Sequence, residues 1–160
     1  MAHCGHWLRW RSSAKMRCMA ALSETHVTLR FHGNDLDPDV LTAVVGGKPS
    51  RAKRMGDMRS AAAAHRGEIR ERTGSWHLSA ERRAPGDLDG QIEELFSQLT
   101  QDLSVWRDLA CYQPNLFVGL FLTESNEGIE ISAASLALLA DRGILLGLDI
   151  YSSESESVVE

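Results

Sequence analysis

The sequence has few cysteines, and it lacks the long apolar runs and the basic surplus that mark several protein classes. Its three cysteines, Cys4, Cys18 and Cys111, form no CxxC pair, which predicts reduced thiols in a cytoplasmic protein. No apolar run approaches the roughly 18 residues of a membrane span, so no membrane partner is expected. The net charge of -5 argues against a nucleic-acid partner, because such proteins are commonly basic.

Motifs for catalysis and cofactor binding are also missing. The sequence has no GxSxG turn to present a nucleophilic serine and no GxxxxGK[ST] loop to bind a phosphate. His3, Cys4 and His6 make only a weak metal cluster, because no second cluster completes four ligands. We therefore expect no catalytic residue, no metal and no cofactor, and an enzyme is not the favoured interpretation.

The composition fits one globular domain, expected at residues 24–152, in a chain of 160 residues with a mean hydropathy of -0.22. Residues 1–23 are basic and lack the apolar core of a secretory signal, which predicts a disordered extension. A transit peptide, or a start codon placed too early, remains an alternative explanation. Residues 153–160 are acidic and rich in serine, and they predict a disordered tail.

The segment GNDLDPDVL carries three aspartates at alternate positions, as a calcium-binding loop does at its start. An EF-hand loop counted from Asp35 requires glycine and glutamate where this chain has Val40 and Gly46. The beginning of a helix explains the same residues better, since Asp37 can cap the backbone and Pro38 suits the first helical position. The segment therefore predicts a helix start and no calcium site.

Apolar periodicity divides the chain into strands and helices. Strand patterns occur in four segments, at residues 26–32, 73–81, 116–123 and 145–151. Helical patterns occur in three segments: residues 38–45, a long amphipathic helix over 88–106, and a helix that Ser132 caps and that ends near Gly143. This order makes two strand-helix-strand halves joined by the long helix. It predicts an α+β fold, ferredoxin-like in plan, with the helices on one face of a sheet.

The best binding candidate is the basic segment at residues 48–72. It could hold a phosphate, an acidic partner or RNA, although a solvated loop beside acidic neighbours is the favoured explanation of its charges. If it binds a ligand, we expect the site to lie between this segment and the strand that contains TGSW. The candidate ligand-binding residues are Arg54, Asp57, Trp76 and His77.

Four short motifs resemble those of a known family. They are the LDPD helix start, the Gly56-Asp57 pair, the TGSW strand and the closing LDIY strand. Over about residues 25–152 the chain resembles the bacterial domain-of-unknown-function family 4279. The resemblance implies a small soluble domain, and it supplies no activity and no catalytic residues.

Two functional hypotheses follow from the sequence. The favoured one is a non-enzymatic module that binds a protein partner or a ligand, because the folding signals are complete and no catalytic constellation is assembled. The alternative is a small-molecule or phosphate-binding protein, or an enzyme, whose site uses residues 48–72 and the TGSW strand. The identity of the ligand or partner and the oligomeric state stay open.

Overall fold

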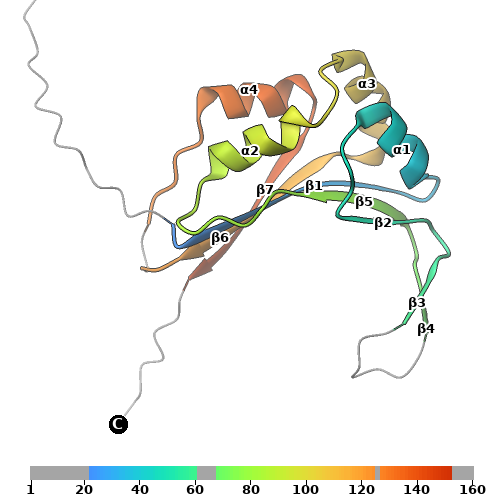
Figure 1. The fold of residues 1–160 in the computed structure, drawn as a ribbon, viewed down its shortest axis with the longest axis horizontal. Coiled ribbons are helices and arrows are strands. Elements are labelled where there is room, and N and C mark those ends of the chain that lie inside the picture. The colour runs from blue at the N-terminus through green and yellow to red at the C-terminus, as the bar shows by residue number, and fades with distance from the viewer. Residues whose placement is uncertain (1–21, 61–67, 125–126, 153–160) are drawn as a thin grey trace, which may run out of the picture.

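A computed structural model describes residues 22–60, 68–124 and 127–152, and it shows a curved sheet with helices along one face (Figure 1). The strands are β1 (Glu24–Gly33), β2 (Arg51–Lys53), β3 (Met58–Ser60), β4 (Glu68–Arg70), β5 (Gly74–Ser79), β6 (Asn115–Leu122) and β7 (Leu145–Ser152). The helices are α1 (Pro38–Val45), α2 (Leu88–Ser97), α3 (Leu103–Asp108), the 3-10 helix η1 (Leu109–Tyr112) and α4 (Ala133–Asp141). The predicted α+β class is confirmed. The predicted tail at 153–160, nearly all of the predicted extension at 1–23, and the His3, Cys4 and His6 cluster lie outside the described residues.

The main sheet has five strands in the order β2-β5-β1-β6-β7, and β3 and β4 form a separate hairpin. All neighbours are antiparallel except β6 and β7, which are parallel and are joined through α4. A ferredoxin-like fold is a split arrangement, in which another strand separates the two strands that a helix connects. Because β6 and β7 are adjacent, the second half of this chain is instead an ordinary βαβ unit. The hairpin projects from the sheet on the side away from the helices (Figure 1).

The core lies between the sheet and the helices. Val27, Leu29 and Phe31 alternate along β1 and are completely buried, as the period of two predicts. The expected helix starts are confirmed: Asp37 accepts hydrogen bonds from two backbone N–H groups of α1, and Ser132 caps α4. The GNDLDPDVL segment is therefore a strand end followed by a capped helix.

The predicted long helix at 88–106 is wrong, because the chain forms α2 and α3 with a break between them. The backbone of the break bonds to the end of α1 instead of continuing the helix: the Thr100 N–H donates to the Val45 carbonyl over 2.8 Å. Asp102 then caps α3 by accepting a hydrogen bond from Ser104. The apolar spacing that predicted one helix continues through the break, because Leu99 and Trp106 are both buried. None of the described helices is both long and apolar enough to cross a lipid bilayer.

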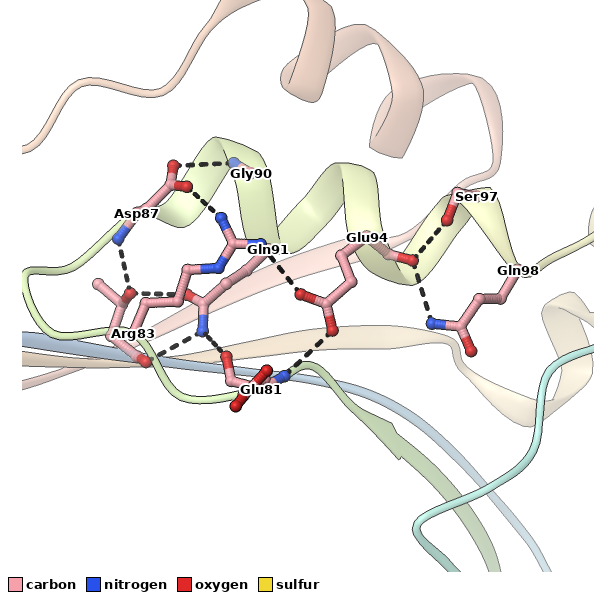
Figure 2. A network of polar contacts seen from close by, with 9 residues as sticks. Glu81, Arg83, Asp87, Gly90, Gln91, Glu94, Ser97 and Gln98 are labelled. Carbon is pink, nitrogen blue, oxygen red and sulfur yellow. Dashed lines mark hydrogen bonds and ion pairs between the residues drawn. The ribbon is translucent and has the colours of Figure 1, made fainter.

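A cluster of polar side chains around Gln91, which we call the Gln91 network, links α2 to the start of β1 (Figure 2). The fully buried Gln91 side chain donates to the carbonyl oxygens of Thr25, over 3.1 Å, and of Glu81, over 2.6 Å. Its own oxygen accepts from the Thr25 hydroxyl over 2.6 Å. Arg83 adds ion pairs to Asp87 and Glu94 at the surface of the cluster. Every polar atom of the Gln91 side chain is bonded, which is what a buried amide needs in order not to destabilise the fold.

Candidate functional site

The sheet face turned away from the helices, called the open face below, carries polar and aromatic side chains. Successive residues of a strand point to opposite faces, so every second residue of each strand belongs to it. Its residues are His26, Thr28, Arg30 and His32 of β1; Arg51 and Lys53 of β2; Ser75, His77 and Ser79 of β5; Asn115, Phe117, Gly119 and Phe121 of β6; and Leu145, Gly147, Asp149 and Tyr151 of β7. The helices lie on the other face of the sheet (Figure 1).

A line of basic side chains crosses three strands of the open face, and we call Arg51, His77 and Arg30 the cationic row. The register places Arg51 opposite His77 and His77 opposite Arg30. Neighbouring strands lie about 4.8 Å apart, so two guanidinium groups flank one imidazole. Arg51 and Arg30 lie two strands apart, with the imidazole of His77 between their charges.

Two members of the cationic row have a buried atom without a protein hydrogen-bond partner. Four such side-chain atoms occur among the described residues. Two of them belong to groups that bond otherwise: Glu24 pairs with Arg82, and Arg142 donates through its other nitrogens. The remaining two are Arg30 Nε and His77 Nε2. Because buried polar atoms are nearly always bonded, these two point to a site where a ligand accepts hydrogen bonds.

The electrostatics of the row favour an anion. Burial is the main cause that lowers the pKa of His77 to about 4, and His32, Arg30, Arg51 and Lys53 lower it further. His77 is therefore neutral at pH 7. Burial also lowers the pKa of Arg30, with Asp149 and Tyr151 acting in the opposite direction. Lys53 pairs with Glu71, whereas Arg51 forms no ion pair with any residue that the structure describes.

Aromatic rings lie beside the row on β6 and β7. The Arg30 guanidinium carbon lies 3.7 Å from the centroid of the Phe117 ring, a cation-π contact that holds the side chain flat on the sheet. Phe121 and Tyr151 stack on each other with 4.8 Å between centroids. His32 and His77 meet edge to face at 5.2 Å. The Arg30 side chain is thus held by packing, so it would lose little freedom on binding a ligand.

A cleft of about 440 Å³ adjoins the row at the end of β1. It is lined by Arg30, His32, Ala110, Gln113, Pro114, Asn115, Gly143 and Leu145. Gln113 ends η1 in the left-handed conformation at φ 49°, which is uncommon for a residue other than glycine. Arg30 and His32 therefore border both the open face and this cleft, and a ligand larger than a single anion could extend from one into the other.

The structure separates the four ligand-binding residues expected from the sequence. Arg54 and Asp57 lie in the turn after β2, where the Arg54 N–H donates to the Asp57 carboxylate over 2.7 Å. The Arg54 guanidinium pairs with Asp37, at 2.8 Å, and with Asp39, at the start of α1. These pairs raise the pKa of Arg54 and contribute to lowering that of Asp37. In the structure, both charges therefore serve the turn and the helix start.

Trp76 and His77 are consecutive residues of β5 and point to opposite faces. Trp76 is 0% exposed, lies against Phe31 at 5.6 Å, and donates its indole N–H to the Thr42 hydroxyl over 2.9 Å. His77 belongs to the open face. Of the four residues, His77 is thus the one that the structure places beside Arg51 from the basic segment.

Arg30, Phe117 and Gln113 were not predicted as site residues from the sequence. The alternation of β1 did contain a signal, because it places Arg30 and His32 on the face opposite Val27, Leu29 and Phe31. What brings them beside His77 and Arg51 is the pairing of β1 and β2 with β5. No local pattern encodes that pairing.

Within the described ranges, His, Cys, Asp and Glu side chains form no group of three that could hold a metal ion. A scan against protein families matches residues 23–153 to the domain of unknown function DUF4279. The chain belongs to this family. No curated protein and no solved structure matches it.

Proposed function

We propose that this DUF4279 domain is a non-enzymatic binding module that holds an oxyanion, a phosphate or carboxylate group of its ligand, on the open face. The single observation that carries this proposal is the cationic row. Arg51, His77 and Arg30 lie side by side on three strands, and two of them keep a buried nitrogen without a protein acceptor. An oxyanion would pair with the two guanidinium groups and accept hydrogen bonds from Arg30 Nε and from the tautomer of His77 that carries its proton on Nε2.

The surroundings of the row support a small ligand with one anionic end. Arg30 presents a planar guanidinium, which matches two oxygens of a phosphate or carboxylate. The adjoining cleft, which Gln113 and Asn115 help to line, offers amide groups to an uncharged part of the ligand. This proposal uses the first residues of the basic segment and the TGSW strand, as the sequence-based alternative expected, and it adds Arg30 from β1.

Titration with inorganic phosphate, followed by backbone amide NMR shifts, tests the proposal. Binding should move the amide signals of β1, β2 and β5 around the cationic row, and Arg30→Ala should weaken binding at least 10-fold, roughly 1.4 kcal/mol. Arg107→Ala is the matched control, since it removes an exposed arginine of α3 on the other face of the sheet. The proposal fails if phosphate moves no signal near the row, or if both variants bind like the native protein.

A panel of small metabolites then identifies the ligand. Phosphorylated and carboxylated compounds of similar size should be compared by the rise in melting temperature that each produces, because a ligand that binds only the native state stabilises it. A compound that fills the cleft as well as the row should raise the melting temperature of the native protein more than inorganic phosphate does. That excess should shrink when Gln113 is replaced by glycine, which keeps the left-handed backbone and removes the amide.

A further inference from the structure

The two edges of the main sheet differ in how they are protected. β2, at one edge, has three residues and carries Arg51 and Lys53 on the open face. Short strands and charges of this kind keep an edge from pairing with another chain. β7, at the other edge, has eight residues, LLGLDIYS, and Asp149 is its only charged residue. No strand in the described part of the chain pairs with the outer edge of β7, and a long edge strand with so little charge favours pairing with another chain.

The exposed side chains of β7 are apolar on both faces of the sheet. Leu148 and Ile150 point to the helix side and are 44% and 59% exposed. Leu145 and Tyr151 point to the open face and are also exposed. The one carboxylate of the strand, Asp149, accepts a hydrogen bond from the Tyr151 hydroxyl over 2.6 Å. The edge therefore combines free backbone hydrogen-bonding groups with a continuous apolar border.

We propose that β7 pairs antiparallel with β7 of a second copy of this chain, about a two-fold axis through Leu148 and perpendicular to the sheet. Such an axis keeps each side chain on its own face of the sheet. It must therefore set one residue opposite its own copy, because opposite residues of paired strands point to the same face. Of the two registers with the greatest overlap, one centred on Asp149 would set two carboxylates opposite each other. Centring on Leu148 sets Asp149 opposite Gly147, Leu146 opposite Ile150, and Tyr151 opposite Leu145. The Leu148 register thus pairs apolar residues with apolar residues and keeps the two carboxylates from standing directly opposite each other.

Helix α4 adds a second layer to this interface. Ser135 and Leu139 of α4 are buried, and Ala134 and Leu138 line the groove toward α2. At 100° per residue, Leu136 lies on the side away from α2, toward the β7 edge, and it is 47% exposed. Helix α4, which connects the parallel strands β6 and β7, packs over both of them. Pairing of the two β7 strands would therefore bring the axes of the two α4 helices to about 10 Å from each other. That spacing is typical of packed helices. Leu136 would then be covered by its mate.

Sedimentation equilibrium of the full chain tests the interface. The native protein should be a dimer, and Leu148→Lys should raise the dissociation constant at least 100-fold, because two ammonium groups would meet on the axis. Val40→Lys is the control: Val40 is 62% exposed on α1, far from the β7 edge in the sheet order, and this variant should dimerise like the native protein. A native monomer at every concentration, or a Leu148→Lys variant that dimerises normally, would overturn the proposal.

Cysteine cross-linking tests the register. In a background with Cys4, Cys18 and Cys111 replaced by serine, Leu148→Cys should form a covalent dimer on mild oxidation. Residues directly opposite in an antiparallel pair have Cα atoms about 4.5–5.5 Å apart, which suits a disulfide. Ile150→Cys should not cross-link, since its counterpart is Leu146, whereas Leu146→Cys combined with Ile150→Cys should. Cross-linking of Ile150→Cys alone, with none for Leu148→Cys, would refute the Leu148 register.

Discussion

Two polar clusters lie on opposite faces of the same sheet, and they differ in how their hydrogen bonds are satisfied. The Gln91 network, on the covered face, bonds every polar atom of its buried amide within the protein. The cationic row, on the open face, leaves Arg30 Nε and His77 Nε2 without a protein acceptor and sets basic groups side by side. The first cluster stabilises the fold, whereas the second costs stability that a bound anion would return. Under the proposed function, the difference separates residues that stabilise the fold from residues that bind the ligand.

The largest expected effect is on the covered face. Gln91→Ala should lower the free energy of unfolding by about 3 kcal/mol, because it removes three hydrogen bonds in a buried site and takes the donor from the Glu81 carbonyl and the acceptor from the Thr25 hydroxyl. Urea unfolding at pH 7 measures this change. The variant should still bind phosphate as the native protein does. A loss below about 1 kcal/mol would show that water replaces the amide and that the network is not structural.

The next largest effect is on binding at the open face. Arg30→Ala should abolish most of the phosphate affinity while changing the free energy of unfolding by less than about 1 kcal/mol, since the lost cation-π contact is offset by removal of a buried nitrogen that has no protein partner. Calorimetry and urea unfolding of the same preparation measure the two quantities. A destabilisation as large as that of Gln91→Ala, with unchanged affinity, would make Arg30 a structural residue.

The fold around the Gln91 network and the cationic row differ in how much of each could be predicted from the sequence. The strands β1, β5, β6 and β7 and the caps of α1 and α4 followed from periodicity and from single residues, because those signals are local. The break between α2 and α3 did not, since it depends on Thr100 bonding to the end of α1. The cationic row could not be predicted for the same reason: Arg30, Arg51 and His77 are distant in the chain and become neighbours only through strand pairing.

His77 should make the stability depend on pH. Its pKa is about 4 in the folded protein, below its ordinary value of 6.5, so the unfolded chain binds a proton in this window that the native state does not. The stabilisation is complete above pH 6.5 and is lost as the pH falls toward 4. Solvent screening of a half-buried group reduces it to about 1 kcal/mol. Urea unfolding across this range measures it, and His77→Gln should flatten the profile while His26 and His32 keep their smaller contributions in the same direction.

The same histidine should link anion binding to protonation. Sulfate stays a dianion across this range, so any change in its affinity reports the protein. Bound sulfate should raise the pKa of His77, and its affinity should rise roughly 10-fold between pH 7 and pH 5. NMR titration of the His77 ring, with and without sulfate, measures the shift. An affinity that rises equally in His77→Gln would assign the effect to other groups.

The smallest expected effect belongs to Arg54. Its ion pairs with Asp37 and Asp39 are exposed, and water and salt screen them, so Arg54→Ala should change stability least of the set. The small difference from the native protein should vanish in 1 M salt, where the Debye length is about 3 Å. Phosphate affinity should be unchanged. A lost affinity would instead extend the site to the turn after β2 and restore Arg54 as a ligand-binding residue.

The rise in melting temperature that phosphate causes in the native protein, in Gln91→Ala and in Arg30→Ala tests the division between the two clusters most directly. The native protein and Gln91→Ala should show the same rise from different starting temperatures, because the binding site is intact in both. Arg30→Ala should start near the native temperature and show no rise. An equal rise in Arg30→Ala, or its loss in Gln91→Ala, would contradict the assignment of the cationic row to binding and of the Gln91 network to folding.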